Sequence, residues 1–241
     1  MAQSLAPNIQ VYPDEDALMA AAAREVVSRL SQGTSCSRVV LPGGRTPVPL
    51  FDHLARSVKL DWRRVCFTFS DERCVEPTRA DSNYRSARKA LLDPLGIPES
   101  QILRLRGEDP PERAAAKAHA ALTCWAQRVP LFDLVILGMG ADAHVASLLP
   151  ASEAPDFGCR LAAATLHPGG QPRISLTPRA LRSSAGTMIL VTGESKAEAV
   201  RDTLAAPPHD PLHPARLVEP EQGSLQWLLD AGAASLLEGA S

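Results

Sequence analysis

Two kinds of hydrophobic pattern alternate along the chain. Short runs of consecutive apolar residues, such as RVVL at 38–41 and FDLVIL at 132–137, predict strands that are buried on both faces. Between these runs, apolar residues recur every three or four positions, which predicts helices with one buried side. The clearest example is residues 14–31, where Asp14 is placed to cap an alanine-rich helix.

The two patterns together predict an α/β fold. Expected strands cover residues 8–12, 38–41, 65–70, 132–137, 173–177, 188–192 and 215–218. Expected helices cover residues 14–31, 47–56, 84–92, 111–129, 178–183, 194–204 and 225–237, and a further helix begins over 143–149. Because strands alternate with helices, we expect a mainly parallel, helix-covered sheet in one domain spanning residues 1–241.

Composition and charge narrow the class of protein. The chain has 241 residues, 45% of them hydrophobic, and a net charge of −2, which does not indicate binding to nucleic acid or to a membrane surface. No apolar run is long enough to span a bilayer, and we expect no signal peptide. The five cysteines are scattered without a CxxC pair, so we expect reduced, mostly buried thiols in a cytosolic protein.

The loop PGGRTP at residues 42–47 is a candidate anion site. Gly43 and Gly44 allow the backbone to approach a ligand closely, and Thr46 is placed to cap the following helix. The unsatisfied N–H groups and the dipole of that helix favour an anion, most plausibly phosphate, and Arg45 adds donors. An ordinary tight turn before a capped helix fits the same spacing equally well. No Gly-Lys-Ser/Thr follows, so the loop is not a P-loop.

A charged motif, SDER at residues 70–73, follows directly after a predicted strand. Asp71, Glu72 and Arg73 are therefore expected at the same edge of the sheet as the glycine loop, where ligands bind in open parallel sheets. Taken alone, three charges at this position are more simply interpreted as a solvated turn with a local ion pair.

The segment 132–150 carries the most informative pattern. A predicted strand ends in a glycine-spaced turn that delivers Asp142 and His144. At the start of a helix the dipole disfavours imidazolium, which leaves His144 available as a base, and Asp142 is suited to cap the helix. Residues two apart on a helix do not face each other, so direct contact between the two requires a turn. A structural histidine at a helix start, or a weak G-x-G-x-x-A nucleotide motif, also fits.

Taken in order, these motifs resemble the 6-phosphogluconolactonase family. The matching segments are GGRTP at 43–47, SDER at 70–73, SNYR at 82–85, GMGADAH at 138–144, RISLT at 173–177 and GESKA at 193–197. The family pattern has proline and glycine where this chain has Ala141 and Ala143. If the second position requires a positive φ, the turn must accommodate the extra methyl group.

The resemblance implies the three-layer fold shared with glucosamine-6-phosphate deaminases, and hydrolysis of 6-phospho-D-glucono-1,5-lactone to 6-phospho-D-gluconate in the pentose phosphate pathway. A lactone is an activated ester, so water and a base suffice, and no cofactor or metal is expected. His144 is the expected base, with Asp71, Asp142 and Arg73 orienting it or stabilising the oxyanion. The expected phosphate-binding residues are Gly43, Gly44, Arg45, Thr46, Arg173 and Lys196. The sugar phosphate is the expected partner of a cytoplasmic monomer or small homo-oligomer.

Two other functions share features with this chain. Amino-sugar-phosphate deaminases have the same fold and a D-G-H motif, but they carry a glutamate where Leu149 stands here, and a tyrosine in place of Arg73. Sugar-phosphate sensors carry an added DNA-binding helix-turn-helix, for which we find no basic segment. The substitutions at Ala141 and Ala143 also leave open a binding protein that has lost catalysis.

Overall fold

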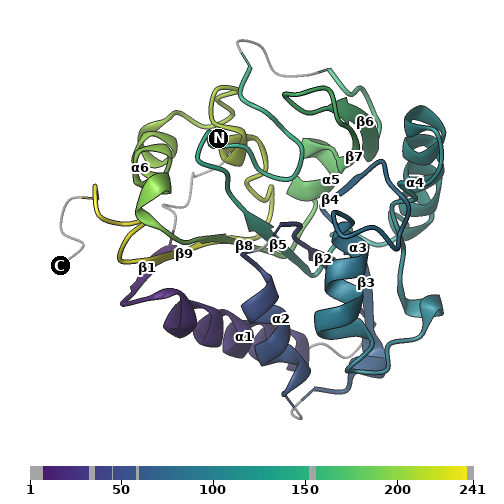
Figure 1. Cartoon of the computed structure of the whole chain (residues 1–241), viewed down its shortest axis with the longest axis horizontal. Coiled ribbons are helices and arrows are strands. Elements are labelled where there is room, and N and C mark those ends of the chain that lie inside the picture. Colours follow the sequence, from purple (N-terminus) through teal and green to yellow (C-terminus); the bar gives the residue numbers. More distant parts are fainter. Residues whose placement is uncertain (1–7, 33–35, 45, 58–59, 152–155, 238–241) are drawn as a thin grey trace.

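The computed structural model describes residues 8–32, 36–44, 46–57, 60–151 and 156–237. Its centre is a parallel sheet of six strands in the order β1-β9-β8-β5-β2-β3 (Figure 1). The strands in that order are β1 (Asn8–Tyr12), β9 (Ser224–Asp230), β8 (Gly186–Val191), β5 (Leu134–Gly138), β2 (Ser37–Leu41) and β3 (Val65–Phe69). The predicted mainly parallel α/β sheet is confirmed.

A second, antiparallel sheet of three strands continues from the first. Its strands are β4 (Asp71–Arg73), β7 (Pro172–Leu176) and β6 (Ala162–Leu166), with β7 in the middle. Only Ser70 separates β3 from β4, so the chain passes directly from the large sheet into the small one. The sequence pattern did not predict β4 or β6, because β4 is three charged residues and β6 is alanine-rich.

Helices complete the layers on both sides of the large sheet. On one face lie α1 (Glu15–Ser31) and α2 (Val48–Ala55), which contact each other (Figure 1). The opposite side carries α5 (Pro178–Arg182), α6 (Ala197–Ala205) and the small sheet. Beside the small sheet, α4 (Pro111–Trp125) packs on β6 and β7. In contrast, α3 (Asn83–Ala87) follows the small sheet's β4 and continues into a π-helical turn at Arg88–Leu92 that contacts α2. Short 3₁₀ turns occur at Trp62–Arg64, Glu99–Gln101, Glu194–Lys196 and Pro214–Leu217.

Burial follows the two predicted periods. Leu134, Val135, Ile136 and Leu137 of β5 are all fully buried, as expected for a central strand covered on both faces. The predicted cap of α1 is confirmed, since Asp14 Oδ1 accepts a hydrogen bond from the backbone N–H of Ala17 at 2.8 Å.

Two predictions near the C-terminal end are wrong. Residues 225–237 do not form a helix, because the run LQWLLD belongs to β9, which pairs with β1 on one side and β8 on the other. Residues 215–218 do not form a strand, because they lie in and just after the 3₁₀ turn Pro214–Leu217. A short continuous apolar run fits a buried strand and a buried helix alike, so only the pairing decides between them.

Two predictions about helix starts are also wrong. Residues 143–149 form a turn closed by a bridge between Val145 and Leu148, and the φ angles of Ala143 (66°) and Ala146 (52°) are incompatible with a right-handed helix. Helix α2 begins after Pro47, so Thr46 does not cap it, and no side-chain cap is found for it among the described residues.

The cysteines differ from the expectation of mostly buried thiols. Cys36, Cys124 and Cys159 are exposed, while Cys66 and Cys74 are partly buried, and all five are free. Of the five, Cys74 packs against the hydrophobic core from the end of β4. Within the part of the chain that the structure describes, no helix is long and apolar enough to cross a membrane.

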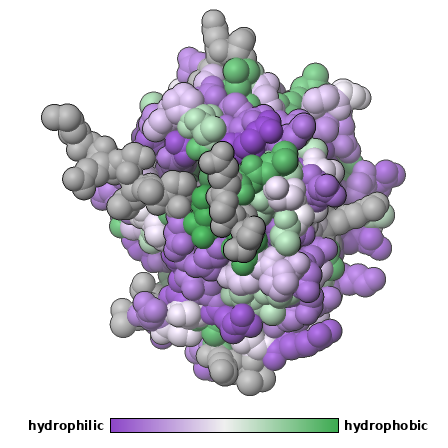
Figure 2. All heavy atoms as spheres, turned by 90° about the vertical axis from the view of Figure 1, so that its left-hand side faces the viewer, coloured by the Kyte–Doolittle hydropathy of each residue, from purple (hydrophilic) through white to green (hydrophobic). Residues whose placement is uncertain are grey.

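The edge strand β1 leaves some apolar surface exposed. Ile9 and Val11 are 39% and 40% exposed. Figure 2, which faces the side of the molecule that carries β1 and α6, shows a mostly hydrophilic surface with hydrophobic side chains gathered near its centre. The other edge of the sheet is β3, whose carboxyl end leads into the site described next.

Candidate active site

A cavity of about 190 Å³ opens where the carboxyl ends of β2, β3 and β5 meet. This is the edge at which an open parallel sheet places its ligands. Most residues singled out from the sequence come together here. The predicted site residues that line it are Gly43, Gly44, Thr46, Asp71, Arg73, His144, Arg173 and Lys196. Arg45 lies outside the described residues, and Asp142 reaches the cavity only through His144.

His144 is held by the turn that follows β5. Its Nδ1 lies 2.5 Å from Oδ1 of Asp142, and the same oxygen accepts the backbone N–H of His144 at 3.3 Å. Because an ionised carboxylate only accepts hydrogen bonds, Nδ1 carries the proton and Nε2 is the free acceptor. Burial raises the pKa of Asp142, but the hydrogen bond and charge of His144 outweigh it, so that pKa lies below its usual value. The ring is thus arranged to accept a proton at Nε2.

Backbone contacts shape this turn in place of a helix. Gly140 N donates to the carbonyl of His144 at 2.9 Å, and Ala143 N donates to the carbonyl of Gly140 at 3.1 Å. A Cβ on Gly140 would lie 2.2 Å from Nδ1 of His144, so only glycine fits there. The prediction that a helix N-terminus tunes His144 is therefore wrong, while the predicted need for a turn is confirmed. Ala143 has a φ of 66°, so the position at which the family pattern has glycine does adopt the left-handed conformation.

Asp71 is buried and is held by several partners. Its Oδ2 accepts from Ser147 Oγ at 2.7 Å and from the Arg173 guanidinium at 3.4 Å, and its Oδ1 accepts from Asn83 Nδ2 at 3.2 Å. The described contacts of Asp71 do not include His144, whose carboxylate partner is Asp142. Asp71 therefore acts on this arrangement by fixing Arg173 and the loop that carries Ser147.

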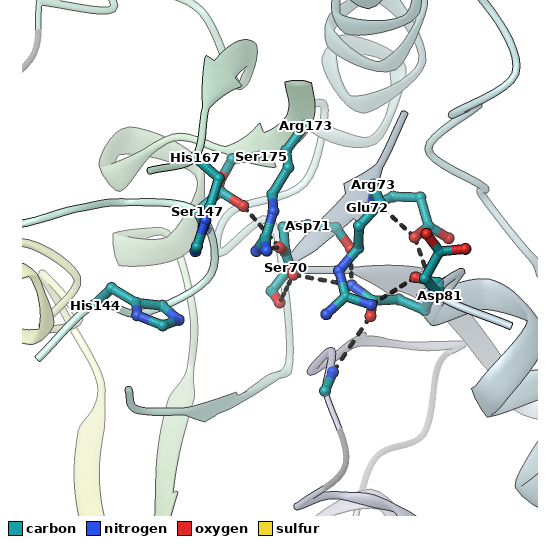
Figure 3. Close-up of polar contacts among 12 residues, drawn as sticks. Ser70, Asp71, Glu72, Arg73, Asp81, His144, Ser147, His167, Arg173 and Ser175 are labelled. Carbon is teal, nitrogen blue, oxygen red and sulfur yellow. Dashed lines mark hydrogen bonds and ion pairs between the residues drawn. The ribbon is translucent and has the colours of Figure 1, made fainter. Parts of the chain in front are cut away.

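Two arginines bring positive charge into the cavity from the neighbouring strands β4 and β7, where they are direct partners in the antiparallel register. Arg73 donates to the carbonyl of Asp81 at 2.6 Å, and Arg173 pairs with Asp71. Figure 3 shows these two side chains and Asp71 grouped on one side, with His144 facing them from the other. The Nε atoms of Arg73 and Arg173 are buried without a hydrogen-bond partner among the described residues. Buried donors without partners favour binding of an anion.

The glycine loop is held by Asn83. The backbone N–H of Gly44, which has a φ of +89°, donates to Asn83 Oδ1 at 3.3 Å. A Cβ on Gly43 would lie 2.2 Å from Asn83 Nδ2. Asn83 thus ties the loop to Asp71, and the sequence offered no more than its place beside a helix start as a signal.

Lys196 adds an ammonium group from the turn before α6. Burial lowers the pKa of Lys196, and the negative charges of Asp230 and Glu15 only partly oppose this shift. The first turn of α2, beside Thr46, also lacks a side-chain cap within the part of the chain that the structure describes. Both features are suited to an anionic ligand.

Glu72 lies behind the cavity and was not recognised from the sequence as a structural residue. It is 3% exposed and accepts hydrogen bonds from the backbone N–H groups of Arg73, Asn83 and Tyr84 and from Ser82 Oγ. Burial raises the pKa of Glu72, and these four hydrogen bonds partly oppose the shift. Glu72 therefore fixes the start of α3, from which Asn83 reaches the loop. Among the described residues, no group of three or more histidine, cysteine, aspartate or glutamate side chains is placed to hold a metal ion.

Comparisons with known proteins show which family this chain resembles in sequence and in fold. Residues 13–227 match the family model for glucosamine-6-phosphate isomerases and 6-phosphogluconolactonases. A 6-phosphogluconolactonase from Aggregatibacter actinomycetemcomitans is 37% identical over 86% of this chain and 90% of its own length. The crystal structure of a 6-phosphogluconolactonase from Thermotoga maritima superposes with a TM-score of 0.79 at 28% identity, covering 93% of this chain and 99% of that one.

The fold is shared more widely than the sequence. A monomeric glucosamine-6-phosphate deaminase superposes with a TM-score of 0.83 over 95% of this chain and 99% of its own, at only 17% identity. At that identity the likeness concerns the fold alone, and the choice between the two reactions depends on the residues in the cavity.

Proposed function

Since the chain belongs to the family of glucosamine-6-phosphate isomerases and 6-phosphogluconolactonases, we propose that it hydrolyses 6-phospho-D-glucono-1,5-lactone to 6-phospho-D-gluconate. The observation that supports this most is the pairing of His144 with Asp142 at a cavity that also holds Arg73, Arg173 and Lys196. A base facing a group of cations matches a substrate with a reactive carbonyl at one end and a phosphate at the other.

His144 is the general base of the proposed reaction. Its Nε2 takes a proton from water as the water oxygen attacks C1 of the lactone, and Asp142 stabilises the imidazolium that forms. The tetrahedral intermediate then expels the ring oxygen, which takes the proton back from Nε2. The C–O bond of the ring breaks and the free base is restored. Positioned proton transfer of this kind contributes about 10²–10⁴-fold to the rate.

The cations divide between the two ends of the substrate. The loop at Gly43, Gly44 and Thr46, together with Lys196 and Arg173, binds the phosphate, because uncapped helix N–H groups and buried positive charges favour a dianion. Arg73 orients the lactone and stabilises the oxyanion. The place of Arg45 on the phosphate remains a prediction from the sequence.

The deaminase reaction is the second candidate, and one observation weighs against it. That reaction opens a sugar ring with a glutamate that precedes the proline closing this segment, and Leu149 precedes Pro150 here. The proposal therefore places the protein with the lactonases, as a cytoplasmic enzyme that acts on a soluble sugar phosphate as a monomer or small homo-oligomer. Light scattering after size-exclusion chromatography measures that oligomeric state.

A direct assay tests the reaction. Lactone is generated in situ, and acid release is followed above the spontaneous background. We expect acceleration by the wild type, a loss of about 10²–10⁴-fold in kcat for His144→Gln, and unchanged binding of 6-phosphogluconate to that variant. His53→Gln, on a partly exposed face of α2, serves as the histidine control with wild-type rates. Binding of 6-phosphogluconate without acceleration by the wild type would rule out the lactonase activity.

A further inference from the structure

Two thiols meet at the end of the sheet away from the active site. The Sγ atoms of Cys36 and Cys66 lie 3.2 Å apart, although 30 positions separate the residues in the chain. Among the described residues, no other two cysteines have their sulfur atoms in contact. Such a contact needs an approach of about 1 Å to reach the S–S bond length of about 2.05 Å.

Strand pairing explains why the two thiols meet. In the parallel register of β2 and β3, Arg38 lies opposite Cys66. Cys36 precedes Arg38 by two residues, and alternate residues of an extended chain point to the same face of a sheet. All three side chains therefore gather on one face, at the amino ends of the two strands. The proposed active site lies at the carboxyl ends, so the thiols form a separate site.

The two sulfurs differ in their surroundings. Cys36 is exposed to solvent, whereas Cys66 is partly buried. Burial raises the pKa of Cys66 to about 11, and the hydrogen bond with Cys36 and the charge of that residue add to the shift. Cys66 therefore keeps its proton at neutral pH, in contact with the sulfur of Cys36. The exposed sulfur of Cys36 is the one that an oxidant in solution reaches first.

Positive charge surrounds Cys36. Arg128 donates to the backbone carbonyl of Cys36 at 3.2 Å, and the guanidinium of Arg38 lies close enough to both thiols to interact electrostatically with them. Asp133 neutralises part of this charge, since it pairs with Arg128 and accepts the backbone N–H of Arg38. Two guanidinium groups and one carboxylate therefore lie around the start of β2, beside the exposed thiol.

We propose that Cys36 and Cys66 form a dithiol modification site that a hydroperoxide converts into an intramolecular disulfide. The Cys36 thiolate attacks the outer oxygen of the peroxide, the O–O bond breaks, and Cys36 becomes a sulfenic acid while the other oxygen leaves as alcohol or water. The Cys66 sulfur then attacks the sulfenic sulfur, the S–O bond breaks, and water leaves with the thiol proton. Two thiols lose two electrons, and the peroxide gains them.

The other cysteines serve as internal controls. Cys124 and Cys159 are as exposed as Cys36 but have no thiol neighbour among the described residues, and Cys74 is partly buried. Trypsin places each cysteine on a different peptide, with Cys36 on residues 30–38 and Cys66 on residues 65–73. Mass spectrometry thereby distinguishes every pairing.

The experiment treats the folded full-length protein with hydrogen peroxide, blocks the remaining thiols with N-ethylmaleimide, and digests it without reductant. We expect a linked pair of peptides 30–38 and 65–73, lighter than their sum by two hydrogen atoms and separated by dithiothreitol, while Cys124 and Cys159 are recovered with the maleimide. Peptides linked at other cysteines, or Cys36 recovered with the maleimide to the same extent as Cys124, would overturn the proposal. The readout does not depend on enzymatic activity, so it is independent of the proposed function.

Two variants separate the two steps. In Cys66→Ser the reaction stops at the sulfenic acid, so dimedone is expected to label peptide 30–38 several-fold more than the Cys124 peptide. In Cys124→Ser the linked pair forms at the wild-type rate. Equal dimedone labelling of the Cys36 and Cys124 peptides would show that the surroundings of Cys36 do not activate it, and would also overturn the proposal.

Discussion

His144 Nδ1 and Asp142 Oδ1 lie 2.5 Å apart, although the residues stand only two positions apart in the chain. In a helix these side chains would point in different directions, and the pair forms because residues 141–148 make turns. One carboxylate thus fixes both the backbone and the tautomer of the proposed base.

The first prediction concerns the negative charge of Asp142, which we expect the proposed base His144 to need. Asp142→Asn keeps the side-chain oxygen for the backbone but no longer fixes the proton on Nδ1 or stabilises the imidazolium. We expect kcat to fall about 10²–10⁴-fold with KM nearly unchanged, measured by acid release from the lactone. Asp156→Asn is the matched control, because Asp156 also accepts a backbone N–H two residues on, from Gly158. An equal loss in both variants would contradict the assignment.

Gly140 leaves room for the ring of His144. In Gly140→Ala the new methyl group would meet the imidazole at 2.2 Å and displace it, so we expect a loss of about 10²-fold or more in kcat. Gly138→Ala provides the comparison, since its nearest neighbour beyond the adjoining residues would be a backbone oxygen 4.0 Å away. Circular dichroism checks that both variants fold, and retained activity in Gly140→Ala would show that the ring does not need this position.

Ala143 has a φ of 66° with a buried methyl group. Glycine at this position relieves backbone strain, which stabilises the folded protein. It also removes a buried methyl group and raises the entropy of the unfolded chain, and both of these effects destabilise the folded protein. Ala143→Gly should therefore change the free energy of unfolding by less than about 1 kcal/mol. Ala143→Val should lower it by about 2 kcal/mol or more, because a β-branched side chain is strained at positive φ. Urea denaturation measures both, and the exposed Ala141→Val is the control. An unaffected Ala143→Val would contradict the left-handed turn.

Glu72 is predicted to be a structural carboxylate. In Glu72→Gln an NH₂ group replaces a carboxylate oxygen that accepts hydrogen bonds from backbone N–H groups. We expect the free energy of unfolding to fall by about 1–3 kcal/mol. Glu76→Gln, at an exposed position, is the control and should change it by less than about 0.5 kcal/mol.

The pH dependence of stability gives a second test of Glu72. Because burial raises the folded-state pKa of Glu72 above its ordinary value of 4.5, the folded protein binds this proton more tightly than the unfolded chain does. The contribution of Glu72 to stability therefore falls as the pH rises from 4.5 through the folded-state pKa. This component of the pH profile should be missing in Glu72→Gln. The same profile in both proteins would assign the dependence to another group.

The lowered pKa of Lys196 leads us to expect that phosphate binding weakens at alkaline pH. Burial lowers the pKa of Lys196 from 10.5, so its ammonium loses its proton, and its attraction for phosphate, at a lower pH than an exposed lysine. We expect the Kd of 6-phosphogluconate, measured by calorimetry, to rise as the pH increases through that lowered pKa. Lys196→Arg keeps its charge and should lose this dependence, whereas Lys196→Gln should bind weakly at every pH. The same alkaline weakening in Lys196→Arg would place the titrating group elsewhere.

Local patterns in the sequence singled out residues that the fold brings to one cavity, but they predicted the C-terminal end of the fold poorly. The strand before Asp142 and the cap at Asp14 depend on neighbouring residues alone, and both are present in the structure. The run at β9 was predicted as a helix, because its apolar residues fit either element until β1 and β8 pair with it. The roles of Asn83 and Glu72 were missed for the same reason, since their partners lie on other segments.

By itself, the sequence determined the α/β class, the family and the chemical groups of the site, since these follow from hydrophobic period and from motifs within a few residues. Tertiary structure decided how those groups are arranged. It placed His144 on a turn instead of a helix, where the ring contacts Asp142. It paired Asp71 with Arg173, and it brought Cys36 into contact with Cys66. These contacts depend on strand register and on positive φ angles, which no local period encodes.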